Sequence, residues 1–209
     1  MKLIPCLFLL ALLPSCGDKA KGQARERDVK QRIAPDMKTA LAEKKLKLGS
    51  PVFIRAFKEE RILELFVKNE KTEKFELFRS YPIAAASGSL GPKLAEGDGQ
   101  VPEGFYFVPP SAMHPNSRYH LAFNIGFPNK FDKANGRTGS FIMVHGSYVS
   151  IGCLAMTDEK IEEIYTVADA AHNGGQAFFR VHIFPFRMTE ARMKKAVDNP
   201  HLPFWQNLK

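Results

Sequence analysis

Cysteine is scarce in this sequence. Only three cysteines stand among 209 residues, at positions 6, 16 and 153. So few exclude a small fold held together by several disulfides. No internal repeat is visible either. Apolar residues are well represented, since 44% of the chain is hydrophobic and 17 residues are Phe. That composition supports a sizeable core and excludes a disordered chain.

Long hydrophobic runs are also lacking, with one exception near the start. Lys2 precedes an apolar run from Leu3 to Leu13, which is too short for a permanent membrane span and is typical of a secretory signal peptide. The letters LPSCG that follow resemble a bacterial lipoprotein cleavage box. We therefore expect a signal peptide over 1–15 and lipid on Cys16, with an ordinary cleaved signal as the alternative. The sequence predicts an exported, periplasmic protein anchored to a membrane.

Positive charge is unevenly spread. The chain has a net charge of +8, and most of the excess lies between residues 19 and 47. Such a segment suits anionic lipid head groups, although a solvated linker is the simpler explanation. In the rest of the chain, positive and negative charges nearly balance. It lacks the alternation of basic and aromatic residues that would favour a nucleic-acid partner.

The order of the patterns predicts a mostly β, α+β domain. We expect a basic linker and a short helix within 16–50, the linker over 18–32 and the helix over 35–48. A catalytic domain follows over 51–187, with a C-terminal helix and tail over 188–209. Runs rich in β-branched and aromatic residues predict strands at 52–57, 62–68, 74–87, 104–109, 119–127, 140–146 and 176–186. The main helix is expected at 157–175, with Thr157 as N-cap.

Cys153 is the only thiol left in the folded domain after the signal peptide and Cys16 are set aside. A lone cysteine in an exported protein is either a reactive thiol or a small buried apolar residue. His145 ends a predicted strand eight residues earlier and can act as its base. Gly152 allows the backbone N–H groups of Gly152 and Cys153 to approach one substrate oxygen. The helix expected near Thr157 should favour thiolate.

The residue motif of this segment is more specific evidence than the spacing of His145 and Cys153. The pattern HG…S-x-G-C-x-x-M after a strand resembles the L,D-transpeptidase catalytic domain, the YkuD family. VHGSYVSIGCLAMTDEKIEEIY, YHLAFNIGFPNKFD and the terminal FW-x-x-L resemble its YafK-like branch. The resemblance covers roughly residue 52 to the C-terminus.

That resemblance implies a sandwich-like, β-rich catalytic fold with one main helix after the nucleophile. Cys153 would be the nucleophile and His145 the general base. The N–H groups of Gly152 and Cys153 would bind the oxyanion, and Ser150 and Gly146 would support the loop.

The resemblance also implies a substrate class, the stem peptides of peptidoglycan. The thiolate would attack the carbonyl on the L-centre of diaminopimelate, and an amine or water would resolve the acyl-enzyme. The hydrolytic direction would release a wall-bound lipoprotein. No metal or organic cofactor is implied. Tyr119 and Asn124 lie in a matching family segment, where they line the cleft or serve a core or turn role.

The sequence departs from the wider family at two positions. Most members carry a second histidine directly before Gly-Cys, where this chain has Ile151, and an arginine two residues after the cysteine, where it has Ala155. The missing arginine removes a bidentate partner for a substrate carboxylate. Arg137 is a candidate substitute, with a solvated surface arginine as the alternative.

Two other functions remain open from the sequence. A sortase-like peptidase has the same order of histidine and cysteine, and Arg180 could serve as its arginine. A non-catalytic, wall-binding lipoprotein would keep the fold without turnover, which the loss of the second histidine motivates. The remaining histidines, at positions 114, 120, 172, 182 and 201, show no metal-ligand spacing with carboxylates and are expected to pack or cap.

Overall fold

The computed structural model describes residues 16–209. The predicted signal peptide, residues 1–15, lies outside the described residues, as does the side chain of Cys16, where we predict lipidation. Within the described part, no helix is long and apolar enough to cross a membrane.

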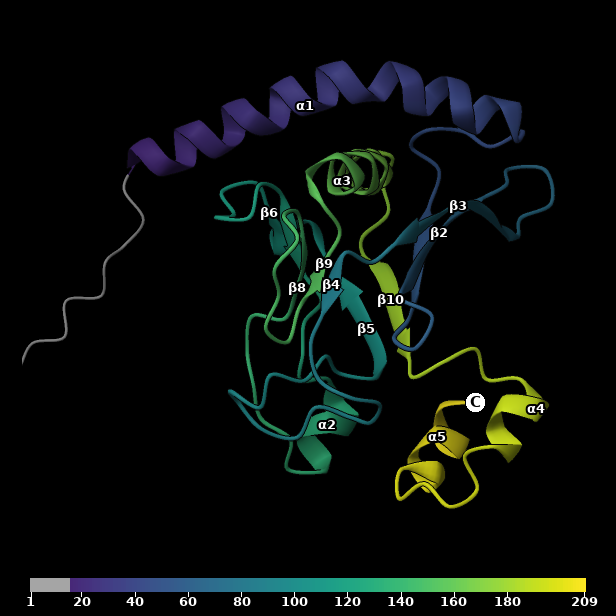
Figure 1. The fold of residues 1–209 in the computed structure, drawn as a ribbon. Coiled ribbons are helices and arrows are strands. Elements are labelled where there is room, and N and C mark those ends of the chain that lie inside the picture. Colours follow the sequence, from purple (N-terminus) through teal and green to yellow (C-terminus); the bar gives the residue numbers. More distant parts are fainter. Residues whose placement is uncertain (1–15) are drawn as a thin grey trace, which may run out of the picture.

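Two five-stranded sheets form the centre of the molecule (Figure 1). The first has the order β3-β2-β1-β10-β5, and β1 and β10 run parallel to each other. Its strands are β1 (Val52–Phe57), β2 (Ile62–Lys68), β3 (Phe75–Pro82), β5 (Gly104–Val108) and β10 (Phe179–Phe184). The strands predicted at 52–57 and 62–68 match β1 and β2 residue for residue.

The second sheet has shorter strands, in the order β4-β9-β8-β7-β6. They are β4 (Ala85–Ala86), β6 (Met113–His114), β7 (Ala122–Asn124), β8 (Met143–His145) and β9 (Leu154–Ala155). Only β8 and β9 are parallel to each other, and the other neighbours are antiparallel. A 3-10 turn, Pro110–Ala112, precedes β6.

Helix α3 (Asp158–Asn173) packs against strands of both sheets and contributes buried residues to the core. Ile161, Ile164 and Ala168 are fully buried, because they recur on one helical face. Thr157 occupies the predicted N-cap position, but its side chain makes no capping bond to the helix backbone. The mixed α+β class expected from the sequence is confirmed by the two sheets with α3.

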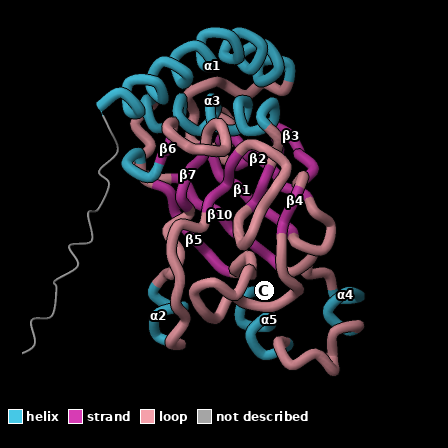
Figure 2. The backbone as a smooth tube through the Cα atoms, turned by 60° about the vertical axis from the view of Figure 1, so that its left-hand side comes forward, coloured by secondary structure: helices cyan, strands magenta, loops and turns pink. Residues whose placement is uncertain are grey.

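The segment before the first strand differs from the prediction. Residues 16–43 form one long helix, α1 (Cys16–Glu43), which contains Pro35 and lies across α3 (Figures 1 and 2). The linker expected at 18–32 and the separate helix at 35–48 are therefore wrong. Charged residues dominate this segment, so few apolar residues recur at helical spacing in its sequence. Its apolar side chains Val29, Met37 and Leu41 are buried in the main core. Ion pairs to α3, Lys30–Asp169 at 2.6 Å and Arg32–Glu162 at 2.7 Å, add contacts that sequence periodicity does not reveal.

The C-terminal region lies at the end of the molecule away from α1 (Figure 1). It consists of α4 (Glu190–Lys194) and α5 (Leu202–Leu208), while α2 (Lys130–Ala134) lies on a connection between β7 and β8. A small cluster around Phe186 and Trp205 is its core.

A buried ionic network joins this tail to the loops beside the second sheet. Glu103 is fully buried and lies 3.0 Å from Lys58 Nζ, and it accepts hydrogen bonds from the Gly91 N–H (2.7 Å) and from Trp205 Nε1 (2.7 Å). Lys58 also donates to the carbonyls of Gly91 and Val101. Burial lowers the pKa of Lys58, and the charge of Glu103 acts in the opposite direction.

Glu103→Gln should lower the free energy of unfolding by about 3 kcal/mol, because it leaves the buried Lys58 ammonium without its counter-charge. Thermal and urea unfolding measure this loss. Glu190→Gln is the matched control, since Glu190 pairs with Lys209 at the surface and such pairs contribute less than about 1 kcal/mol. Equal losses in the two variants would contradict a structural role for the network.

Candidate active site

Strands β8 and β9 bring His145 and Cys153 onto the same face of the second sheet. In their parallel pairing Val144 lies opposite Leu154, and His145 lies opposite Ala155. Paired residues point to the same side and neighbours along a strand alternate. Continuing the register by one residue places Cys153 opposite Met143. Cys153 and His145 therefore share the face opposite to the buried Val144 and Leu154.

The Cys153 sulfur lies against the backbone of the segment that leads into β8. The Met143 N–H donates to Sγ at 3.3 Å, and the thiol donates to the Phe141 carbonyl at 3.7 Å. The Met143 N–H favours thiolate, whereas the Phe141 carbonyl favours the neutral thiol. Sequence reasoning missed this N–H, because only the register of two short strands places it at the sulfur.

Burial raises the pKa of the Cys153 thiol above its ordinary value, while the Met143 N–H and the charge of Lys93 act in the opposite direction. Burial thus outweighs the groups that favour thiolate, and the contribution of the following helix stays a prediction. Helix α3 begins five residues downstream, and the Asp158 carboxylate in its first turn accepts the Ser147 N–H at 2.7 Å. A negative charge thus stands at the helix end that was expected to stabilise thiolate.

Lys93 is a cation that the sequence did not single out. Its side chain is 3% exposed, pairs with Asp98 at 2.6 Å and donates to the Ala95 carbonyl at 2.9 Å. It comes from the Gly- and Pro-rich loop between β4 and β5, which gives no sequence signal for proximity to the thiol.

His145 is buried, with 2% of its surface exposed. Its Nδ1 lies 2.6 Å from the Gly146 carbonyl. A carbonyl only accepts, so Nδ1 carries the proton and the neutral ring keeps its lone pair on Nε2. Burial lowers the pKa of the imidazole, and the bond to Gly146 acts in the opposite direction. The ring is thus held as a neutral base.

Tyr119 lies directly on this imidazole. The two rings stack with centroids 4.8 Å apart and planes inclined by 30°. The Gly146 N–H also bonds to the carbonyls of Tyr119 and Leu121, at 3.0 and 3.1 Å. Tyr119 is therefore a neighbour of the histidine. Its contact with substrate stays a prediction.

The loop before the nucleophile is closed by two serine hydroxyls. The Gly152 N–H donates to Ser87 Oγ at 2.6 Å, and the Cys153 N–H donates to Ser150 Oγ at 3.0 Å. Ser150 in turn donates to the Cys153 carbonyl at 2.7 Å. Gly152 has φ +85°, a conformation that favours glycine. Both N–H groups predicted for the oxyanion are thus occupied in this conformation, and their role stays a prediction.

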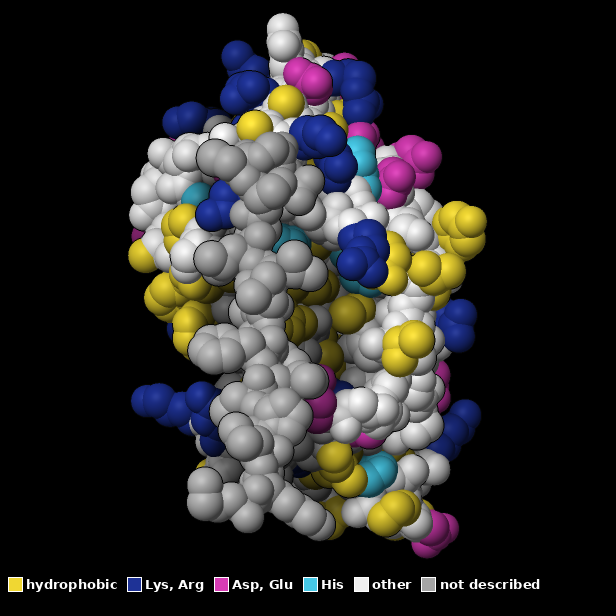
Figure 3. Space-filling view, turned by 90° about the vertical axis from the view of Figure 1, so that its left-hand side faces the viewer, with side chains coloured by type: hydrophobic (Ala, Val, Ile, Leu, Met, Phe, Trp, Pro, Cys, Tyr) yellow, Lys and Arg dark blue, Asp and Glu magenta, His cyan; other side chains and the backbone are white. Residues whose placement is uncertain are grey.

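A cavity of about 450 Å³ lies beside the segment that leads into β8, and neither Cys153 nor His145 lines it. Phe141 and Met143, whose backbones contact Sγ, line one part of it, and Asn124 and His114 line another. Asn124 has the turn role that the sequence left open, since its Oδ1 accepts the Gly126 N–H at 2.9 Å; its place in a substrate cleft stays a prediction. Hydrophobic side chains gather over the hollowed middle of the face that contains β6 and β8 (Figure 3).

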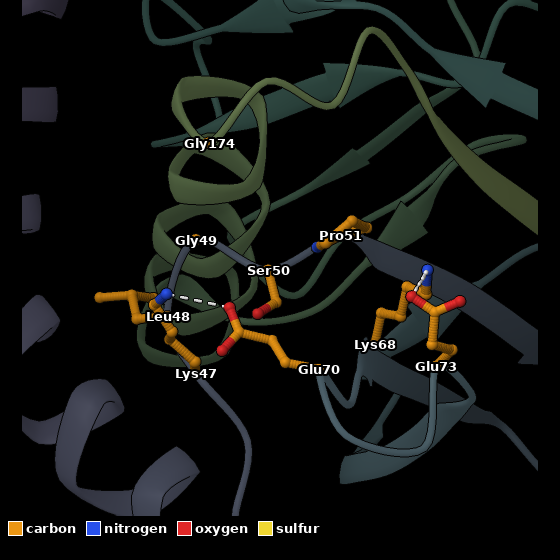
Figure 4. Close-up of a pocket in the computed structure, with 9 residues that line it drawn as sticks. All are labelled: Lys47, Leu48, Gly49, Ser50, Pro51, Lys68, Glu70, Glu73 and Gly174. Carbon is orange, nitrogen blue, oxygen red and sulfur yellow. Dashed lines mark hydrogen bonds and ion pairs between the residues drawn. The ribbon is translucent and has the colours of Figure 1, made fainter.

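A second hollow, of about 440 Å³, has no part in this chemistry (Figure 4). It lies where the chain enters β1, and the ion pairs Lys47–Glu70 (2.9 Å) and Lys68–Glu73 (3.5 Å) engage its charged side chains. It contains neither Cys153 nor a histidine.

Arg137 is not the substitute that the sequence offered. Its guanidinium is 8% exposed, pairs with Asp132 at 2.8 Å and lies over the rings of Phe131 and Phe204, at 5.3 and 4.5 Å from their centroids. The alternative of a solvated surface arginine is wrong as well. Its fixed partners explain both corrections, because they come from α2 and α5, elements that the sequence patterns did not predict.

The other histidines serve local contacts. His120 pairs with Glu162 at 2.9 Å, His172 bonds to the Gln176 carbonyl, and His182 packs against Phe53 and Phe105. Within residues 16–209, no group of three His, Cys, Asp or Glu side chains is arranged to hold a metal ion.

This chain is similar to known proteins in sequence. The family model for the L,D-transpeptidase catalytic domain, YkuD, matches residues 51–183, more than half of the chain. A protein of Escherichia coli strain K12, named "Putative L,D-transpeptidase YafK", is 43% identical over 209 residues, which cover all of this chain and 77% of that protein. The counterpart in Escherichia coli O157:H7 gives the same values. The chain belongs to the YkuD family.

A solved structure supports the fold of this YkuD domain. A mutant of the helical cell shape determining protein Pgp2 from Campylobacter jejuni superposes with a TM-score of 0.52 at 22% identity. The match covers 76% of this chain and 58% of that one, so this chain spans less than two thirds of its length.

The two departures from the wider YkuD pattern occupy different environments. Ile151 is 85% exposed at the tip of the loop, whereas Ala155 is fully buried opposite His145. An arginine at the second position would have to enter a packed site. The YkuD domain of this chain therefore has no arginine at this position for a substrate carboxylate.

Alkylation of Cys153 by iodoacetamide should be slow at neutral pH and should increase with a midpoint above the ordinary thiol value of about 8.5. Lys93→Met should raise the midpoint further, because it removes a charge that favours thiolate, whereas Lys47→Met should leave it unchanged. Mass spectrometry of the tryptic peptide 138–160 isolates this thiol from the other cysteines. A native midpoint below that of the unfolded chain would contradict the burial argument.

Proposed function

We propose that this protein is a peptidoglycan-modifying cysteine acyl transferase of the L,D-transpeptidase type. The observation that carries the proposal is the shared face of His145 and Cys153 on paired parallel strands, with Nε2 of the buried imidazole free of its proton. A neutral base beside a neutral thiol can take the proton as the sulfur attacks.

The proposed reaction begins when Nε2 of His145 takes the thiol proton and the sulfur attacks the carbonyl on the L-centre of diaminopimelate. A C–S bond forms and the carbonyl becomes an oxyanion. Collapse of this intermediate breaks the C–N bond, and the imidazolium protonates the departing amine. An acceptor amine or water then attacks the thioester and restores the thiol.

The oxyanion needs N–H donors that the resting loop already uses. In the proposal, the Gly152 and Cys153 N–H groups turn to the substrate oxygen when the hydroxyls of Ser87 and Ser150 release them. Donors aimed at developing charge contribute about 3 kcal/mol each in known acyl-transfer sites. The backbone of Gly152 can adjust to this change because glycine tolerates several conformations.

The hydrolytic direction, in which water resolves the thioester and a wall-bound lipoprotein is released, uses the same two residues. Phe141 precedes β8, and Tyr148 and Ile151 lie in the loop before Cys153. Their apolar side chains are exposed and offer a surface to a bulky acyl donor. Export through the signal peptide and anchoring through Cys16 would place the domain at the wall.

A non-catalytic wall-binding lipoprotein is the second candidate. The raised pKa of Cys153 and the occupied N–H groups of the loop favour it. The two candidates differ in turnover. Binding to purified peptidoglycan without release or exchange of stem peptides would identify the second.

Cys153→Ala should abolish turnover of purified muropeptides, and His145→Gln should lower it by about 10²- to 10⁴-fold, the usual contribution of a general base. Liquid chromatography with mass spectrometry measures the products. New cross-links indicate amine acceptors, whereas trimmed stems or freed lipoprotein indicate water.

Arg180→Met is the matched control. Arg180 lies on β10 in the first sheet, away from the sheet of Cys153, so activity should be retained. Loss of activity in this variant would favour the sortase-like arrangement. Full turnover by Cys153→Ala would contradict the proposed function.

A further inference from the structure

Helix α1 touches the segment that carries Tyr119 through a glycine, Gly22. A Cβ on Gly22 would stand 1.5 Å from Asn116 Oδ1 and 2.9 Å from Asn116 Cα. No side chain fits there unless the two elements move apart. The contact therefore fixes how closely α1 approaches the turn before Tyr119.

Arg25 lies one turn further along α1 and binds the same segment. Its NH1 donates to the Ser117 carbonyl at 3.1 Å and to the His120 carbonyl at 2.6 Å. These two carbonyls flank Tyr119, so one guanidinium nitrogen holds the backbone on both sides of the ring. Charge-assisted bonds of this kind are stronger than neutral ones.

A third connection runs through α3. Glu162 Oε1 lies 2.7 Å from Arg32 of α1 and 2.9 Å from His120 Nε2. Residues 116–121 are therefore bound by α1 directly and also through a carboxylate of α3.

The other side of this segment meets the histidine. Tyr119 stacks on the His145 ring, and the carbonyls of Tyr119 and Leu121 accept the Gly146 N–H. Gly146 is also the residue whose carbonyl accepts His145 Nδ1–H. Both the plane of the imidazole and its tautomer thus depend on where residues 116–121 lie.

We propose that α1 positions His145, with Gly22 and Arg25 holding residues 116–121 and Tyr119 transmitting that position to the imidazole. Arg25 and Tyr119 are positioning residues, since they act through the histidine. The kinetic consequence rests on the proposed function, in which His145 is the base. The structural consequence, a fixed imidazole, does not. Because α1 directly follows the predicted lipid anchor, the state of this helix would bear on the reactive site.

The test compares two charge-removing changes on α1 in the full chain. Arg25→Met breaks the bonds to residues 116–121. Lys30→Met is the matched control, because Lys30 binds Asp169 and Glu26 and not that segment. The first readout is the ring-proton NMR signal of His145. Loss of the stacked tyrosine should shift it in Arg25→Met, in the direction that Tyr119→Leu gives, and should leave it unchanged in Lys30→Met.

The second readout is turnover. Arg25→Met should lower kcat by about 10-fold or more, since a small misplacement of a reacting group has effects of this size, and KM should hardly change. Arg25→Lys should restore most of the rate, because one ammonium can donate to both carbonyls. Gly22→Ala, which forces α1 away from Asn116, should reproduce the defect.

Three outcomes separate the claims. An unshifted His145 signal in Arg25→Met, or an equal shift in Lys30→Met, overturns the inference. A shifted signal and a lowered kcat in Arg25→Met alone support it. If the signal shifts in Arg25→Met alone but the wild-type protein turns over no muropeptide, positioning by α1 is supported while the proposed function fails.

Discussion

The parallel pairing of β8 with β9 is the constraint on which the site depends. Two short strands set the register, and with it the face on which the histidine and the cysteine lie. A slip of one residue would turn one of the two side chains into the core. The hydrogen bond from Met143 N–H to the sulfur follows from this register. The larger first sheet and α3 supply the packed support that fixes it.

Desolvation decides the resting state of the pair. Burial raises the pKa of Cys153 and lowers that of His145, so both groups are neutral before substrate arrives. This differs from a preformed thiolate–imidazolium pair, and under the proposed function it makes proton transfer part of the attack. The hydroxyls of Ser87 and Ser150 occupy the Gly152 and Cys153 N–H groups, and under the proposed function a carbonyl oxygen replaces them.

Much of the fold and the central pair could be predicted from the sequence, because strong local patterns encode them. The strands β1 and β2 and helix α3 carry clear periodicity, and the segment around Cys153 carries a family signature. The rest depends on contacts distant in sequence. Helix α1 is joined to α3 by ion pairs, and the charge of Lys93 acts on the pKa of the thiol from a remote loop. Arg137 was misassigned because α2 and α5, which enclose it, left no pattern.

The central claim is that Cys153 becomes acylated. The most direct measurement is to expose the full chain to a carbapenem, quench in acid and map the adduct by mass spectrometry. The account predicts one adduct, on peptide 138–160 at Cys153, which is absent in Cys153→Ala and slower to form in His145→Gln. An adduct elsewhere in the chain, or none at Cys153 in a protein that turns over stem peptides, would contradict it.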